Sequence, residues 1–113
     1  MIVGDDLFVT QANRLQLGIE KKAGNGIIIK PDQAGTVSRT LETVKLAKKS
    51  KFSTVVSHRS GETMDSFISD LAVGIGSSLI KCGIFGKVRK AKHDRLLQIW
   101  KKIKKPKLAK VSY

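Results

Sequence analysis

Short apolar segments alternate with longer amphipathic segments along this chain at an even spacing, and this feature limits its possible folds most. The predicted strands end near residues 4, 30, 57 and 81, so successive ends lie 24 to 27 residues apart. Each strand is followed by a segment whose apolar residues recur three and four positions apart, as on the packed face of a helix. Strands that alternate with helices indicate parallel strands joined by helical crossovers. The sequence therefore predicts an α/β fold of four consecutive βα units.

The same periodicity predicts helices over residues 12–22, from 36 or 38 to 49, around 67–72, and over 88–104. Residues 31–35 contain Pro, Asp and Gly and are predicted to be a loop. A complete barrel of eight βα units takes about 250 residues, so four units predict half of a TIM-type barrel. We expect this partial barrel to cover residues 1–105, with a basic, disordered tail at 106–113. The side chains expected to face the core are Leu15, Ile19, Ala23, Leu41, Val44, Ala47 or Lys48, Phe67, Ile68, Leu71, Ala72, Leu96, Leu97, Trp100 and Ile103.

Length and composition exclude several classes of protein. A chain of 113 residues, 41% of them hydrophobic, has the size of one globular domain with one core. The single cysteine, Cys82, cannot form an internal disulfide or, with two histidines, supply a four-ligand zinc site, which favours a cytoplasmic location. No apolar run approaches the roughly 20 residues that span a bilayer. Ile2 and Val3 resemble the end of a buried strand with no turn before them, so we expect a chain that begins within a fold.

The positive charge is concentrated in the last third of the sequence. The net charge is +13, and residues 79–113 hold 12 Lys and Arg against one Asp. Nucleic acid or an anionic membrane would therefore meet the basic tail rather than the rest of the chain. The apolar face of the last helix has two interpretations: it packs on the barrel wall beside a solvated lysine face, or it binds an acidic partner.

Polar residues follow all four predicted strands. They are Asp5 and Asp6, Lys30, the run His58, Arg59 and Ser60, and Lys81. In parallel α/β folds these loops open on one face, so the groups are expected to converge there. Carboxylates suit Mg²⁺, arginine suits a phosphate, and a lysine among cations can act as a base. Taken singly, each is also an ordinary loop or cap residue, and Ser60 or Glu62 could cap the next helix.

Other catalytic and nucleotide-binding motifs do not fit. Ser60 lies between Arg59 and Gly61 and so is outside a G-x-S-x-G elbow. Gly74 and Gly76 lack the third glycine of a dinucleotide-binding loop, and GIFGKV lacks the spacing of a P-loop. The convergent strand ends therefore remain the best candidate site.

Several strings in this order and spacing resemble the C-terminal part of the barrel domain of enolase. They are IVGDDLFVT, IIIK followed by QAGT, VVSHRSGET, DSFISDLAVG and IKCG, and together they cover about residues 2–97. The combination of SHRSGET after a strand, GDDL before it and IK-x-G after it is specific. The resemblance implies the C-terminal half of a TIM-type barrel.

The resemblance also implies an activity, the reversible dehydration of 2-phosphoglycerate to phosphoenolpyruvate in glycolysis. Asp5 matches a carboxylate of the family that binds Mg²⁺. Lys30 matches the catalytic lysine that removes the proton from C2 of the substrate. The family also forms homodimers as full-length proteins.

Four further residues match substrate-binding positions of the family. Arg59 and Ser60 match residues that bind the substrate phosphate, and His58 lines the same pocket. Lys81 matches the lysine that contacts the substrate carboxylate. These positions agree with the site expected from the polar strand ends.

The chain departs from the family pattern near several of these positions. Pro31 follows the predicted base, and Asp32 replaces an asparagine, which adds a negative charge beside Lys30. Met64 stands where the family has a glutamate. After Lys81 the sequence keeps the helix frame but exchanges acidic residues for lysines.

The family's other metal carboxylates and its acid glutamate have no counterpart in these residues. We therefore expect the isolated chain to be inactive. Two alternatives stay open: a non-catalytic binding protein that uses its basic C-terminal helix, and a half-barrel that dimerises into a complete barrel.

Overall fold

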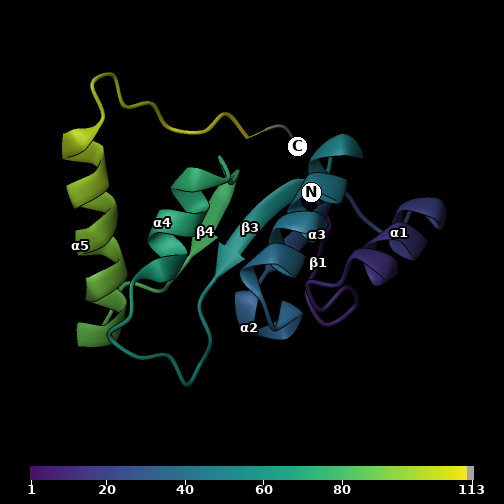
Figure 1. Ribbon diagram of the computed structural model, residues 1–113, viewed down its shortest axis with the longest axis horizontal. Helices are drawn as coiled ribbons and strands as arrows, with labels where there is room; N and C mark the ends of the chain where they lie inside the picture. Colours follow the sequence, from purple (N-terminus) through teal and green to yellow (C-terminus); the bar gives the residue numbers. More distant parts are fainter. Residues whose placement is uncertain (112–113) are drawn as a thin grey trace.

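A single sheet of four parallel strands organises the structure (Figure 1). The computed structural model describes residues 1–111, and the strands in this range lie in the order β1-β2-β3-β4. This arrangement confirms the predicted α/β fold of consecutive βα units. The elements are β1 (Val3–Gly4), α1 (Ala12–Glu20), β2 (Gly26–Ile29), α2 (Pro31–Ala34), α3 (Val37–Lys49), β3 (Ser53–Ser57), α4 (Phe67–Gly74), β4 (Leu79–Lys81) and α5 (Lys87–Lys102).

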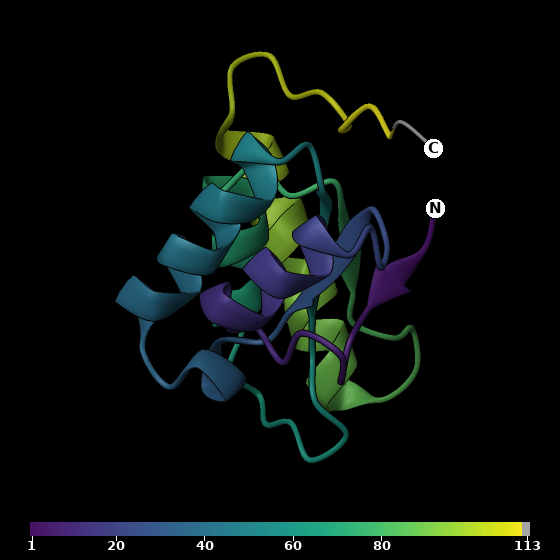
Figure 2. The ribbon, with the colours of Figure 1, turned by 90° about the vertical axis from the view of Figure 1, so that its right-hand side faces the viewer.

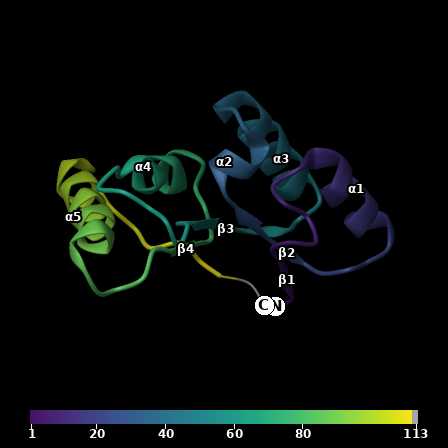
Figure 3. The ribbon, with the colours of Figure 1, turned by 90° about the horizontal axis from the view of Figure 1, so that it is seen from below.

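The hydrophobic core lies between the sheet and the helices on one of its faces. Figure 3 shows α1, α3 and α4 on that side, with α5 beyond β4 at one end. Successive strand residues point to opposite faces, so Ile27 and Ile29 both point toward the helices. Both are fully buried and pack with Leu15, Val44 and Val56 in the main apolar cluster.

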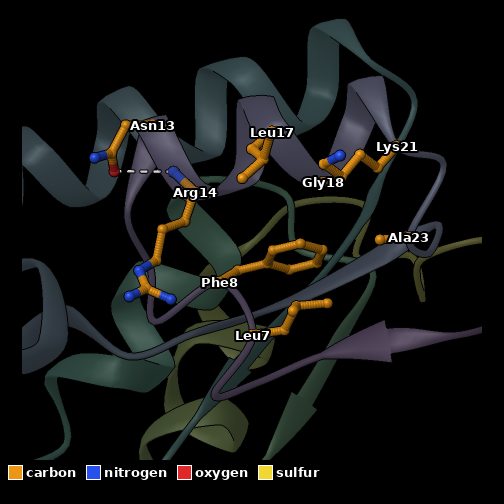
Figure 4. A pocket seen from close by; sticks show the side chains of 8 residues that line it. All are labelled: Leu7, Phe8, Asn13, Arg14, Leu17, Gly18, Lys21 and Ala23. Carbon is orange, nitrogen blue, oxygen red and sulfur yellow. Dashed lines mark hydrogen bonds between the residues drawn. The ribbon is translucent and has the colours of Figure 1, made fainter.

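Phe8 anchors the loop between β1 and α1, and the sequence analysis missed it. Its side chain is fully buried and packs edge-on against Phe52, with ring centroids 6.1 Å apart. Figure 4 shows the ring beneath α1, next to Gly18. A Cβ on Gly18 would lie 2.3 Å from the ring, and a Cβ on Gly4 would lie 2.4 Å from it. The two glycines therefore leave room for the ring, which holds the loop that carries Asp5.

Helix α3 buries Val44 and Ala47 as predicted, but it does not bury Leu41. Leu41 is 43% exposed, so its predicted place in the core is wrong. Thr40 and Thr43 are buried beside Val44 and Ala47 instead. The threonines can enter the core because their hydroxyls donate to backbone carbonyls, Thr40 to that of Thr36 at 2.8 Å and Thr43 to that of Thr10 at 3.1 Å.

Three smaller differences arise from local geometry. Pro31–Ala34 is one helical turn rather than a loop, because proline suits the first helical position and Gly35 ends the turn with a φ of 83°. Ala23 is exposed because α1 ends at Glu20. Phe67 is 41% exposed at the start of α4, whereas Leu71 and Ala72 are buried as predicted.

Helix α5 leaves much of its apolar face uncovered. Leu97, Trp100 and Ile103 are 59%, 43% and 42% exposed, so the expectation that they pack on the barrel wall is wrong. The reason is that α5 packs along α4, through the Arg95–Asp70 ion pair at 2.6 Å. The Arg95 hydrogen bonds also hold the pKa of Asp70 below its ordinary value.

The segment after α5 runs back toward the start of the chain (Figures 1 and 2). Residues 106–111 form no helix or strand, and the last two residues of the predicted tail lie outside the described range. The boundary between residues 105 and 106 stays a prediction. None of the helices formed by residues 1–111 combines the length and the apolar character needed to cross a membrane.

Candidate functional site

The predicted site residues lie at the carboxyl ends of the four strands, which all point to the same end of the sheet. Asp5 follows β1, Lys30 follows β2, His58 follows β3, and Lys81 is the last residue of β4. The register places Ser57 opposite Lys81, and the backbone N–H of His58 donates to the Lys81 carbonyl at 3.0 Å. The parallel order therefore brings successive site residues, which are 23 to 28 positions apart in the sequence, to the same end of the sheet.

Asp5 and Lys30 form a direct ion pair across β1 and β2. The Lys30 Nζ atom lies 2.8 Å from Asp5 Oδ1 and 2.9 Å from Oδ2. The Lys30 side chain is only 12% exposed and that of Asp5 37%. Oδ1 is shielded from solvent and accepts no hydrogen bond among the described residues, whereas Oδ2 accepts one from Lys30. The predicted base and the predicted metal ligand are therefore in contact.

A buried threonine fixes the backbone of Lys30. Thr10 Oγ1 accepts the backbone N–H of Lys30 at 2.9 Å and lies 3.0 Å from the side-chain oxygen of Gln33. Gln11 donates to the Gln33 carbonyl at 2.8 Å, and Thr43 donates to the Thr10 carbonyl. Thr10 has a φ of 52°, an uncommon backbone conformation for a threonine. Sequence reasoning missed this network because its members lie far apart in the sequence: Thr10 and Gln11 precede α1, Gln33 lies in α2 and Thr43 lies in α3.

Arg59 faces a carboxylate of the chain itself. Its guanidinium lies 3.0 Å from Asp32, at the start of α2, and both side chains are about half exposed. Asp32 was expected to act on Lys30, but its carboxylate contacts Arg59, whereas Lys30 is paired with Asp5. Ser60 is exposed in the same loop. Asp32 would therefore compete with an incoming phosphate for Arg59.

Glu62 is the centre of a buried charge cluster behind this loop. Its Oε1 atom lies 2.7 Å from His58 Nδ1 and 3.3 Å from Arg89 Nε, and its Oε2 atom lies 3.0 Å from Lys92 Nζ. Glu62 and Lys92 are 7% and 3% exposed. Burial raises the pKa of Glu62, but the hydrogen bonds and charges of His58 and Lys92 outweigh it and hold the pKa below its ordinary value. The cluster ties the loop after β3 to α5.

This placement corrects the expectation that Glu62 or Ser60 caps the following helix. Helix α4 begins at Phe67, and its N-cap residue is Ser66. The side chain of Asp65 accepts the backbone N–H of Phe67 at 2.9 Å. The many lysines and arginines after β4 indicated that a carboxylate such as Glu62 could find a cation there. Which cation it contacts depends on how α5 packs against the loop after β3.

A cavity of about 310 Å³ adjoins the predicted substrate-binding loop. Its lining includes Asp32, His58, Arg59, Glu62 and Lys92. Arg59 and Lys92 thus border the cavity together with Asp32 and Glu62, the carboxylates that pair with them, whereas Lys30 and Lys81 do not line it.

The described residues do not form a complete magnesium site. Within residues 1–111 no group of three or more His, Cys, Asp and Glu side chains is placed to hold a metal ion. Asp5 offers one shielded oxygen, but its carboxylate is paired with Lys30. Hard divalent cations require several oxygen ligands, so these residues alone do not fit a metal.

Parallel strands, outer helices and polar groups at the carboxyl strand ends define a barrel-type α/β protein with its site at that edge. The family model described as "Enolase, C-terminal TIM barrel domain" matches residues 1–109. The chain therefore belongs to the enolase C-terminal barrel family, and the predicted resemblance is confirmed.

Curated relatives agree with this assignment. The chain is 49% identical over 104 residues to the enolase of Ureaplasma parvum serovar 3 (strain ATCC 700970) and 53% identical over 104 residues to that of Helicobacter pylori (strain J99). Each alignment covers 91% of this chain and 24% of the relative. The chain thus spans about a quarter of the length of these relatives.

Proposed function

We propose that this chain supplies part of a phosphopyruvate hydratase site, in which a lyase of glycolysis interconverts 2-phosphoglycerate and phosphoenolpyruvate. The observation that carries the proposal is the placement of Asp5, Lys30, Arg59 and Lys81 at the ends of four adjacent parallel strands in an enolase-family chain. A cytoplasmic location, as expected from the cysteine count, belongs to the same proposal.

In this proposal Arg59 and Lys81 bind the substrate, and Lys30 removes a proton from it. Arg59 and Ser60 bind the phosphate, His58 borders it, and Lys81 contacts the carboxylate. Lys30 removes the proton from C2, which requires it to leave the ion pair with Asp5 and to lose its own proton. The hydroxyl group on C3 then leaves as water, protonated by an acid that would come from outside the described residues. The buried environment of Lys30 and its backbone contact to Thr10 support this role, because they restrict the position of the amine.

Mg²⁺ is the cofactor that the family resemblance suggests, with Asp5 as one ligand. Both carboxylate oxygens of Asp5 contact Lys30 Nζ, so metal binding would require this ion pair to open, and further carboxylates would have to come from outside the described residues. We therefore expect no turnover from the isolated chain. Formation of phosphoenolpyruvate, followed by absorbance with Mg²⁺ present, tests this, and measurable turnover would show that the chain is sufficient.

Binding of 2-phosphoglycerate tests the substrate site without requiring turnover. Titration into ¹⁵N-labelled protein should shift the amide signals of residues 30, 58–60 and 81 in a saturable way. Arg59→Gln should weaken binding about tenfold, since it removes a charge-assisted hydrogen bond. Arg14→Gln is the matched control, because Arg14 is an exposed arginine on α1, away from the site. Equal affinity for the two variants, or no saturable shift, would contradict the proposal.

Asp32 offers a second test of the same site. Asp32→Asn removes the carboxylate that contacts Arg59 but keeps the size of the side chain. Affinity for 2-phosphoglycerate should rise in this variant, because the phosphate no longer competes with a fixed carboxylate. A fall in affinity would show that Asp32 does not oppose the ligand.

A non-catalytic role in binding an acidic partner is the second candidate, and one observation favours it. Six lysines between residues 101 and 110 are exposed, and this stretch contains no Asp or Glu. Nucleic acid and anionic membranes are the partner classes that such a segment fits. These lysines are Lys101, Lys102, Lys104, Lys105, Lys107 and Lys110.

Retention on heparin and on vesicles of phosphatidylserine and phosphatidylcholine tests this second candidate. Retention should decrease with salt and be lost when residues 101–113 are removed. Retention that survives this deletion would place the anion-binding surface elsewhere.

A further inference from the structure

We propose that Glu62 is a positioning residue: its carboxylate keeps a proton on Nδ1 of His58, which leaves Nε2 as the ring nitrogen that meets a ligand. This role rests on the proposed function for the identity of the ligand, 2-phosphoglycerate. The place of the proton can be measured without any ligand.

Backbone hydrogen bonds hold His58 at the carboxyl end of β3. Its N–H donates to the Lys81 carbonyl at 3.0 Å, and its own carbonyl accepts the Ser57 hydroxyl at 3.0 Å. The side chain is 13% exposed and borders the cavity of about 310 Å³. These contacts place the ring at the cavity, but they do not decide which nitrogen carries the hydrogen.

The imidazole meets Glu62 through one nitrogen. Nδ1 lies 2.7 Å from Oε1 of Glu62, four residues further along the same loop. Among residues 1–111, Nε2 of His58 has no hydrogen-bond partner. An ionised carboxylate only accepts hydrogen bonds, so Nδ1 must be the donor when Glu62 is charged. The hydrogen bond at Nδ1 then fixes the tautomer of the ring.

Two cations of α5 keep the Glu62 carboxylate charged. Lys92 Nζ lies 3.0 Å from Oε2, and Arg89 Nε lies 3.3 Å from Oε1. Burial raises the pKa of Glu62, but the hydrogen bonds and charges of His58 and Lys92 outweigh it and hold the pKa below its ordinary value. A neutral Glu62 that donates its own proton to Nδ1 is therefore disfavoured at neutral pH.

The carboxylate has little freedom to turn away from the ring. Lys92 and Glu62 are 3% and 7% exposed. The Lys92 ammonium group also donates to the carbonyls of Thr63 and Val88, and its backbone carbonyl accepts the Ser69 hydroxyl at 2.8 Å. These contacts join the loop after β3 to α4 and α5. The direction of the carboxylate, and with it that of the imidazole, is therefore set by the packing of α5.

A fixed Nδ1–H gives His58 a defined role toward an anion in the cavity. Arg59 is already paired with Asp32 and Lys92 with Glu62, whereas Nε2 is left for the ligand. Only the charged imidazole carries hydrogens on both nitrogens, so it alone can donate to Glu62 and to a phosphate at the same time. Such a hydrogen bond is charge-assisted and about twice as strong as a neutral one. Glu62 therefore makes His58 a stronger phosphate ligand.

Nitrogen chemical shifts of the imidazole test the place of the proton in the ligand-free chain. In a long-range ¹H–¹⁵N spectrum at about pH 8, Nδ1 of His58 should have the shift of a protonated nitrogen. His58→Asn distinguishes its signals from those of His93. In Glu62→Gln the proton should move to Nε2, because the buried Lys92 ammonium attracts the amide oxygen and leaves the amide NH₂ facing Nδ1. An unprotonated Nδ1 in the unaltered chain, or no change in Glu62→Gln, would overturn the inference.

A double-variant comparison separates positioning from a purely structural role. Glu62→Gln should weaken binding of 2-phosphoglycerate about tenfold, because Nε2 then donates from a neutral ring. His58→Asn keeps a donor near the place of Nδ1 but has no group in place of Nε2. Adding Glu62→Gln to it should therefore change the affinity less than about twofold. Glu42→Gln is the matched control, since Glu42 is exposed on α3. An equal loss in both backgrounds would show that Glu62 acts on the fold alone.

The two measurements also separate this role from the proposed function. A protonated Nδ1 that depends on Glu62, in a chain that does not bind 2-phosphoglycerate, would support the placement of the proton and contradict the proposed function. An unprotonated Nδ1 in a chain that binds this ligand would do the reverse. Circular dichroism checks that every variant is folded, and the spectrum of the unaltered chain requires no variant.

Discussion

Replacing Lys92 with methionine should destabilise the folded chain by about 3 kcal/mol, because it leaves a buried carboxylate oxygen without its cation. Lys92 Nζ lies 3.0 Å from Glu62 Oε2, and the two side chains are 3% and 7% exposed. Breaking a buried ion pair costs about 3–5 kcal/mol. The lower end applies here because His58 and Arg89 still contact the other oxygen of Glu62. Methionine keeps the aliphatic stem, so the loss reports on the ammonium group, which also donates to the backbone carbonyls of Thr63 and Val88.

Urea unfolding at pH 7, followed by circular dichroism and Trp100 fluorescence, measures this effect. Lys90→Met is the matched control on the same helix: its side chain is 70% exposed and paired with Asp94, so we expect a change within about 0.5 kcal/mol. The double variant Glu62→Gln with Lys92→Met removes both charges of this pair, so its cost should fall about 2 kcal/mol below the sum of the single costs. Additive costs, or equal stability of the Lys90 and Lys92 variants, would refute the reasoning.

Three further predictions address other parts of the structure. Gly18→Ala should cost about 2 kcal/mol in urea unfolding, because the new Cβ would lie 2.3 Å from the Phe8 ring; wild-type stability would show that the ring can move. The pKa values of Glu62 and Asp70 are lowered in the folded state, so these two carboxylates should stabilise the fold fully above about pH 5, and this contribution should be lost as the pH falls through the lowered pKa values; a flat pH profile would contradict this. Burial, followed by the charge of Glu62, raises the pKa of Cys82, so iodoacetamide should modify it slowly in the folded protein and quickly in urea; equal rates would show that the thiol is accessible.

The order of elements and the position of the site could be predicted because they depend on local sequence. The isoleucines at 27–29 define a buried strand, and Lys30 directly follows it. Parallel pairing then requires the polar strand ends to share one edge. The face that each helix buries was less predictable: Leu41 fits the apolar period, but Thr40 and Thr43 are buried because backbone carbonyls accept their hydroxyls.

The sequence by itself determined the α/β alternation, the residues at each strand end and the family to which the chain belongs. Only the tertiary structure decided which charges meet. Asp32 contacts Arg59 rather than Lys30, and Glu62 meets Lys92 thirty positions away instead of capping a helix. The physical reason is that strand identity follows from neighbouring residues, whereas an ion pair depends on how separate βα units pack. The exposed apolar face of α5 also results from tertiary packing, because α5 contacts α4 through the Arg95–Asp70 ion pair and leaves Leu97 and Trp100 exposed.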